Sequence, residues 1–214
     1  MSPLSPTIAL LGLVSTISAL PFWGSRTEVR TSLPTLPSSA LSAPTGTLEV
    51  IALGVGHQNY TCNATTNTFS SNTALADLYD ATKFFSNTPV AIPFLPSARL
   101  NQYNAMGADS LKADFLPYLQ HIGTHYFEAA SPAPIPNFNL SGVNLFLSSK
   151  KVCSVLAPTS NAIAWLYLEA NGSPLTKGLS SVYRVETAGG VPPSSCRAGD
   201  TAHVPYVAEY WFYA

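Results

Sequence analysis

Apolar and polar positions change places over short distances along most of this chain. Between residues 47 and 214, short runs rich in Val, Ile, Tyr and Phe are separated by Pro, Gly and Asn, a pattern typical of strands joined by turns. The expected strands are 47–55, 56–62 (as a continuation or a partner of the first), 75–79, 123–128, 138–147, 152–156, 163–169, 182–187 and 203–213. This spacing predicts a mostly β domain, built as an antiparallel β-sandwich or as a barrel.

Residues 81–120 do not follow this alternation, and we expect a loop-rich insertion there. Leu111, Phe115 and Leu119 recur every four residues behind Asp109, which predicts a short helix inside the insertion.

Alternation within two of the strands predicts which side chains face the core. Cys62 shares one face of its strand with Gln58 and Tyr60, so Asn59 is expected to face outward. In the last strand, residues 203–213, aromatic side chains occupy both faces. That pattern is typical of a central strand buried on both sides. Alternatively, it provides an aromatic surface on which sugars could stack.

One polar residue of the last strand requires a partner under either interpretation. Glu209 shares its face with Trp211, and we expect it to pair with a base such as Arg184 across the sheet.

The N-terminal region differs in composition from the rest. The apolar run Ile8–Leu20 is shorter than the roughly 20 residues that cross a bilayer and ends in small residues, which predicts a signal peptide over 1–19. The alternative is a buried N-terminal segment. Residues 20–46, rich in Pro, Ser and Thr, predict a linker, and 47–214 a single β-rich domain. No later apolar run is long enough for a membrane span.

Glycosylation sequons support passage through a secretory route. Each has the form Asn-x-Ser/Thr, and they begin at Asn59, Asn63, Asn139 and Asn171. We therefore expect a secreted glycoprotein, extracellular or attached to a cell wall.

Cysteine usage is consistent with an oxidising compartment. Of the three cysteines, we favour a disulfide between Cys62 and Cys196, which on the chain-entropy model is worth at most about 4–5 kcal/mol. Cys153 stands in an apolar run and is expected to be a buried thiol. No Cys or His spacing typical of zinc is present, and we expect neither a metal nor a cofactor.

Charge excludes one class of partner. Charged residues are 10% of the chain and the net charge is −1, with no basic patch that could neutralise a phosphate backbone. Nucleic-acid binding is therefore not expected.

Five motifs in a fixed order resemble a known family: GHQNYTC, GTHYFE, AIAWLYL, VYRVETAGGVPPSSC and VPYVAEYWFY. They are similar to a secreted bacterial and fungal family known only as a domain of unknown function, whose fungal members are often labelled malate dehydrogenase. The resemblance covers roughly residues 48–213 and implies a secreted, mostly β domain. It supports the pairing of Cys62 with Cys196, because both lie in its motifs. It implies no activity.

The dehydrogenase label can be tested on the residues. A dinucleotide-binding turn needs three spaced glycines between a strand and a helix. Gly54 and Gly56 are present, but Asn59 stands where the third glycine should be, and strand-like residues follow it. We do not expect dehydrogenase activity.

His125 and Glu128 are the best candidates for functional polar residues. His125 could act as a general base or ligand, or it could be a hydrogen-bonded structural imidazole. His121 and His125 on one strand would lie about 13 Å apart, too far for one ion. No G-x-S-x-G nucleophile motif is present.

Together these patterns favour a non-catalytic secreted protein that binds a wall polysaccharide or a small apolar ligand. The candidate binding aromatics are Tyr126, Trp165, Tyr206 and Trp211. One alternative is a secreted hydrolase or metal-dependent enzyme that uses His125. Another is an effector or elicitor that acts on a host.

Overall fold

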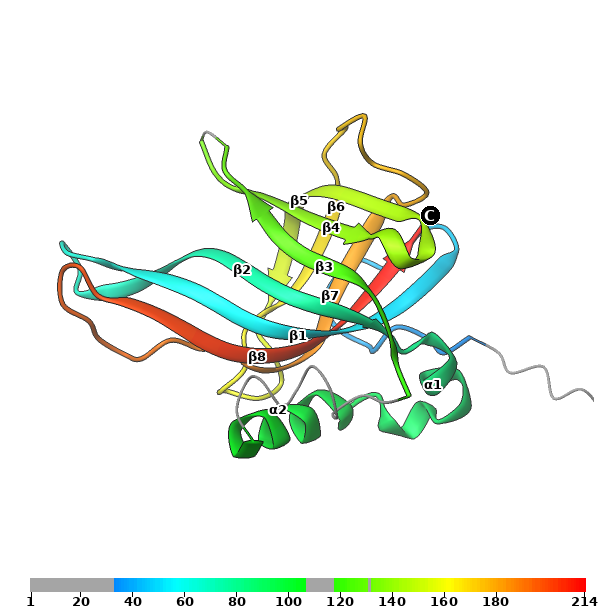
Figure 1. Cartoon of the computed structure of the whole chain (residues 1–214), viewed down its shortest axis with the longest axis horizontal. Coiled ribbons are helices and arrows are strands. Elements are labelled where there is room, and N and C mark those ends of the chain that lie inside the picture. Colours follow the sequence, from blue (N-terminus) through cyan, green and yellow to red (C-terminus); the bar gives the residue numbers. More distant parts are fainter. Residues whose placement is uncertain (1–32, 107–117, 131) are drawn as a thin grey trace, which may run out of the picture. The chain divides into compact units, whose positions relative to one another are not determined.

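The computed structural model describes residues 33–106, 118–130 and 132–214, and its strands form a closed antiparallel barrel (Figure 1). Each strand pairs with the next, and the last pairs with the first. The strands are β1 (Leu48–Asn63), β2 (Thr68–Asp80), β3 (Gln120–Glu128), β4 (Ile135–Leu140), β5 (Leu145–Val155), β6 (Trp165–Ala170), β7 (Ser181–Gly189) and β8 (Thr201–Tyr213). The prediction of a mostly β domain is confirmed, and the sheet closes into a barrel instead of forming two sandwich layers.

Several of the expected strands have different limits in the structure. The runs 47–55 and 56–62 form the single strand β1. The run 138–147 is interrupted by η2, a 3-10 turn (Ser141–Val143), and by Asn144, whose φ of 60° is left-handed. Asn tolerates this conformation better than most residues, so the chain can reverse there and start β5.

The barrel interior is one of two hydrophobic cores. Alternate residues of every strand point inward and pack together, as expected of a small barrel filled by side chains. The largest fully buried members are Tyr206, Tyr210, Phe138, Phe212, Leu78 and Ile122.

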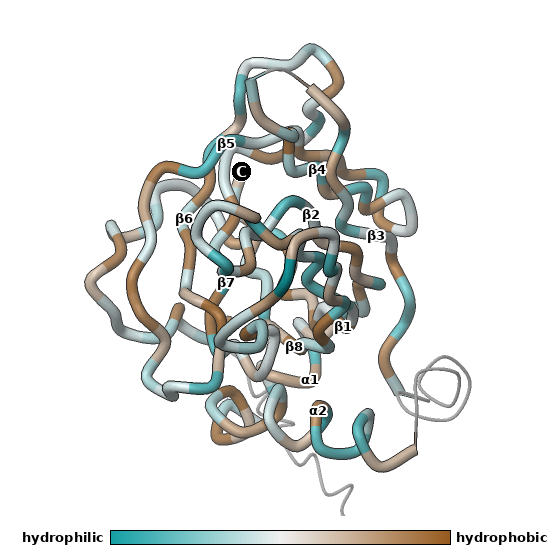
Figure 2. Tube along the Cα trace, turned by 90° about the vertical axis from the view of Figure 1, so that its left-hand side faces the viewer, coloured by the Kyte–Doolittle hydropathy of each residue, from teal (hydrophilic) through white to brown (hydrophobic). Residues whose placement is uncertain are grey.

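The second core lies outside the barrel, on the outer surface of β6, β7, β8 and β1, which we call the covered face. It is covered by the segment 33–46 together with the helices α1 (Thr82–Asn87) and α2 (Leu95–Met106). Figures 1 and 2 show both helices on the side of β1 and β8, away from β4 and β5. Burial of the last strand on both faces is thus confirmed.

Residues 81–120 contain more helix than expected. α1 is followed by η1, a 3-10 turn (Pro89–Ala91), and then by α2, which buries Leu95 and Tyr103 against the barrel. The predicted helix behind Asp109 falls mainly on 107–117, outside the described residues, as does the predicted signal peptide over 1–19. No helix in the described ranges is long and apolar enough to cross a membrane.

The disulfide between Cys62 and Cys196 is confirmed. It links the end of β1 to the connection between β7 and β8, with the two Cα atoms 5.8 Å apart. The predicted alternation also holds, because Cys62 is buried while Asn59 is only half-buried. Cys153 carries a free thiol and is half-buried against the second core.

Candidate functional site

His125 lies inside the barrel, in a closely packed position. Its imidazole ring stacks on Phe138 with the ring centroids 4.2 Å apart. The centroid of the Tyr210 ring lies 5.7 Å from that of the imidazole. Nδ1 donates a hydrogen bond to the carbonyl oxygen of Asn137 at 2.9 Å, because a carbonyl can only accept. Burial lowers the pKa of His125 to about 4, so the ring is neutral at physiological pH.

Glu128 points to the other side of the sheet. One of its carboxylate oxygens accepts a hydrogen bond from Asn137 Nδ2 at 3.2 Å. The structure therefore does not bring His125 and Glu128 together in one site.

His121 does not join His125 either. It is exposed, and its Nε2 atom lies 3.4 Å from Oδ1 of Asp77. The described ranges contain no cluster of three or more His, Cys, Asp or Glu residues suited to a metal ion.

Three of the four candidate aromatics are buried in the two cores. Trp165 and Trp211 belong to the covered face, and Tyr206 lies inside the barrel with its hydroxyl 2.8 Å from that of Tyr210. Only Tyr126 is part of an uncovered surface.

The predicted pairing of Glu209 with Arg184 is wrong, because the two side chains lie on opposite sides of the sheet. Arg184 points into the barrel and donates to the carbonyl oxygen of Ala164 at 2.8 Å. Glu209 lies on the covered face, where it accepts from Trp211 Nε1 at 2.9 Å. Burial raises the pKa of Glu209 to about 9, so this carboxyl group is protonated at neutral pH.

The two spaced glycines of β1 also serve packing. A side chain on Gly54 would collide with the ring of Tyr210, and one on Gly56 would collide with the backbone at Leu75 and Ala76. Both glycines lie within a continuous antiparallel strand. They therefore allow close packing against the neighbouring strands β8 and β2, and no helix begins after them as a dinucleotide site would require.

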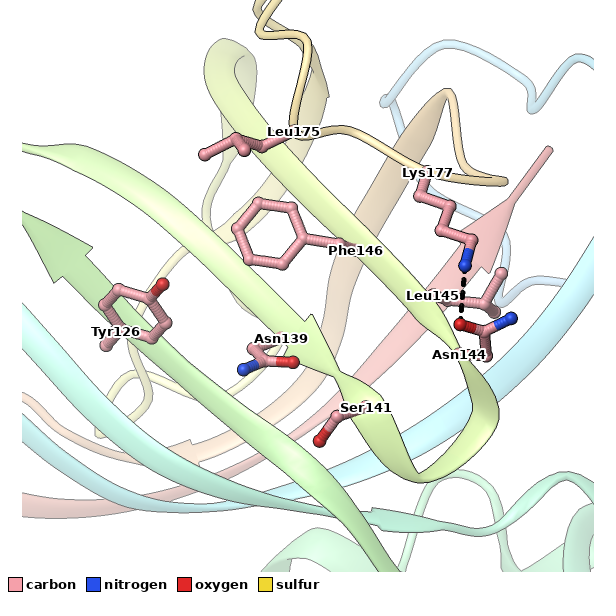
Figure 3. Close-up of a pocket in the computed structure, with 8 residues that line it drawn as sticks. All are labelled: Tyr126, Asn139, Ser141, Asn144, Leu145, Phe146, Leu175 and Lys177. Atoms are coloured by element: carbon pink, nitrogen blue, oxygen red, sulfur yellow. Dashed lines mark hydrogen bonds between the residues drawn. The ribbon is translucent and has the colours of Figure 1, made fainter.

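The outer surface of β3, β4 and β5, which we call the open face, carries a pocket of about 380 Å³. Figure 3 shows the side chains around this open pocket, with the ring of Tyr126 on β3 and that of Phe146 on β5. It is lined by Tyr126, Asn139, Ser141, Asn144, Leu145, Phe146, Leu175 and Lys177.

The pocket is assembled from three strands, the turn between β4 and β5, and the loop between β6 and β7. Asn139 of β4 stands directly opposite Phe146 of β5 in the register of the sheet. The loop between β6 and β7 is fixed to β5, because the backbones of Phe146 and Lys177 exchange hydrogen bonds of 3.1 and 2.8 Å. This attachment places the exposed side chain of Leu175 at the rim.

The open pocket carries polar groups that can form hydrogen bonds with a ligand. Lys177 Nζ donates to Asn144 Oδ1 at 2.5 Å, which fixes the one charged group of the pocket. The amide of Asn139 and the hydroxyl of Ser141 form no side-chain hydrogen bond with the described part of the protein, so both can bind a ligand. No His, Cys or carboxylate side chain lines this pocket.

Most of these residues were not predicted from the sequence. Asn139 and Ser141 stand out there only as a sequon, and Asn144, Phe146 and Lys177 belong to no pattern that predicts a site. The one usable signal was alternation, which places Asn139 and Tyr126 on the same outer surface once the pairing of β3 with β4 is known.

The fold and the site define a closed antiparallel barrel protein with a polar and aromatic pocket on its outer wall. The chain belongs to the family described as protein of unknown function (DUF3455), whose model matches residues 43–214. No curated protein and no solved structure was found to match it.

Proposed function

We propose that this protein is a secreted, non-catalytic glycan-binding protein of the extracellular space or cell wall, and that it binds through the open pocket. One observation carries the proposal: two half-buried aromatic rings, Tyr126 and Phe146, flank the amide of Asn139, whose side chain forms no hydrogen bond within the described ranges. The other three candidate aromatics, Trp165, Tyr206 and Trp211, are buried in the two cores.

The chemistry of a sugar matches these groups. A pyranose ring has an apolar C–H surface that packs on an aromatic ring, and its hydroxyl groups need donors and acceptors at their edges. Tyr126 and Phe146 offer the rings, while Asn139 and Ser141 offer an amide and a hydroxyl. The volume of about 380 Å³ is within the usual range of ligand sites, roughly 300–1,000 Å³.

A secreted location is supported by several independent features. The disulfide between Cys62 and Cys196 is of a kind that persists in oxidising compartments. The apolar run at the N-terminus and the sequons are consistent with the same route.

The alternatives have weaker support. An apolar ligand inside the barrel would compete with the interior side chains of Phe138, Tyr210 and Phe212, which are fully buried. In a hydrolase, His125 would have to act as the base. Its Nδ1 is already hydrogen-bonded, and its ring is packed against Phe138 and Tyr210. No feature of the structure favours an effector over a glycan-binding protein.

The test is isothermal titration of the unglycosylated protein with neutral and acidic hexasaccharides: chitohexaose, laminarihexaose and hexagalacturonate. We expect measurable binding to at least one, and a loss of about tenfold or more in Phe146→Ala, since removal of a stacking ring costs about 1–2 kcal/mol. Tyr118→Ala is the matched control, because this tyrosine is 92% exposed and lies beside Phe84 and Leu95 on the helical side.

Two results would contradict the proposal. One is that none of the three oligosaccharides gives heat with the unsubstituted protein. The other is that Phe146→Ala and Tyr118→Ala bind with the same affinity.

A further inference from the structure

We propose that an N-linked glycan on Asn139 occupies the open pocket of the same molecule, so that an external glycan binds only to molecules in which Asn139 is unmodified. This inference rests on the proposed secreted, glycan-binding function. It follows from a comparison of the four sequon asparagines, which have very different surroundings in the folded protein.

Two of the four asparagines have an Nδ2 atom that is already hydrogen-bonded to the protein. Asn59 Nδ2 donates to Thr73 Oγ1 at 3.0 Å, and its Oδ1 lies 2.7 Å from His203 Nδ1. Asn171 Nδ2 donates to Ser148 Oγ at 2.9 Å. A sugar is attached through Nδ2, so at both positions it would have to fit beside a hydroxyl group that is in contact with that nitrogen.

The other two asparagines have an Nδ2 atom without such a contact. Asn63 is exposed at the end of β1, where its Oδ1 accepts from the backbone N–H of Thr65 at 2.9 Å. Asn139 is half-buried, and both it and Ser141 of the same sequon line the open pocket. Asn63 therefore carries a glycan away from the pocket, while Asn139 carries one within it.

The attachment step is an ordinary group transfer. Asn139 Nδ2 forms a bond to C1 of an oligosaccharide carried on a lipid diphosphate. The bond from C1 to the phosphate oxygen breaks, the lipid diphosphate leaves with the electron pair, and Nδ2 loses one proton.

The position of Asn139 determines what the first sugar touches. Figure 3 shows its amide between Tyr126 and Ser141, with Phe146 on the neighbouring strand. The first N-acetylglucosamine thus meets the same rings that would stack on an external sugar. Because it is tethered, its effective concentration is of millimolar order. A free oligosaccharide that binds the pocket with the same affinity displaces the tethered sugar only when its own concentration exceeds this effective concentration.

The test uses the full chain secreted from yeast behind a heterologous leader, compared with Asn139→Gln and with the matched control Asn63→Gln. Site occupancy is measured by mass spectrometry. Hydroxyl-radical footprinting measures the reactivity of Tyr126 and Phe146, with the exposed Tyr118 as an internal reference. We expect Asn139 to be occupied, and both rings to react severalfold more in Asn139→Gln but not in Asn63→Gln.

Either of two footprinting results would overturn the inference. Asn139 could be unoccupied while Asn63 is occupied, or the two rings could react equally with and without the Asn139 glycan.

Titration of bacterially produced, unglycosylated protein separates this inference from the proposed function. Ring protection in the yeast protein, without binding of any hexasaccharide to the bacterial protein, would refute the binding function and retain the pocket as the site of its own glycan. Hexasaccharide binding to the bacterial protein, together with an unoccupied Asn139 in the yeast protein, would support the binding function and refute this inference.

Discussion

The covered face and the open face belong to the same barrel and both carry aromatic side chains, yet they differ in what lies on top of them. On the covered face, Tyr183 and Trp211 are fully buried beneath helices and the segment 33–46. On the open face, Tyr126 and Phe146 stay half-buried around a pocket. An aromatic strand is therefore part of a core or of an exposed surface, depending on whether another element covers it.

The polar groups differ in the same way. On the covered face, Glu209 is fully buried, and its raised pKa keeps it uncharged at neutral pH. On the open face, Lys177 is exposed and bonded to Asn144 at the rim of the pocket. Charge is thus neutralised by protonation under the helices and kept in contact with water where the face is open.

The largest expected effect concerns the covered face. Trp211→Ala should lower the free energy of unfolding by about 3–5 kcal/mol, because it leaves a large cavity in the second core and removes the donor to Glu209. Urea denaturation measures the change. A loss below about 1 kcal/mol would mean that the helices do not bury this ring.

Inside the barrel, His125→Ala should cost about 2–3 kcal/mol. It removes the stacking partner of Phe138 and leaves the carbonyl of Asn137 without its donor. Thermal and urea unfolding measure the cost. Unchanged stability would revive a functional role for the imidazole.

Glu209→Gln tests the buried carboxyl group through pH. The folded pKa, about 9, lies above the unfolded value of about 4.3, so this group's stabilising contribution is complete below about pH 4.3 and is lost as pH rises towards 9. In that window it lowers the free energy of unfolding by up to about 1.4 kcal/mol per pH unit. The glutamine variant lacks this slope.

The measurement is urea denaturation of the wild type and Glu209→Gln at pH 5 and pH 8, with the exposed Glu49→Gln as the matched control. The free energy of unfolding of Glu209→Gln minus that of the wild type should be larger at pH 8 than at pH 5. An identical pH dependence in all three proteins would show that Glu209 is ionised in the folded state.

The smallest stability effect is expected on the open face. Phe146→Ala should change the free energy of unfolding by about 1 kcal/mol or less, because the ring is half exposed. The same variant should still lose glycan binding. A stability loss as large as that of Trp211→Ala would mean that Phe146 belongs to a core and that the two faces do not differ.

Much of the fold could be predicted because local alternation determines it. The buried position of Cys62 and the two-sided burial of β8 follow directly from a period of two. The sequence left both a sandwich and a barrel open, since closure depends on pairing between β1 and β8 at opposite ends of the domain. α2 was missed because its contacts with the barrel, made through Leu95 and Tyr103, do not form a regular apolar stripe.

The candidate site was harder to predict for a physical reason. Size and hydrophobicity drew attention to Trp165 and Trp211, but these same properties make a side chain suitable for a core. Asn144 and Lys177 are 33 positions apart, and only the pairing of Phe146 with the loop between β6 and β7 brings them together. No local pattern carries that information.

The most direct test of the open pocket is an NMR titration of protein with ¹³C-labelled Tyr and Phe rings, using the three hexasaccharides. The account predicts that ring signals of Tyr126 and Phe146 shift in proportion to binding, while those of Tyr183 and Tyr213 on the covered face do not. Shifts confined to Tyr183 and Tyr213, or no shift with any of the three, would contradict it.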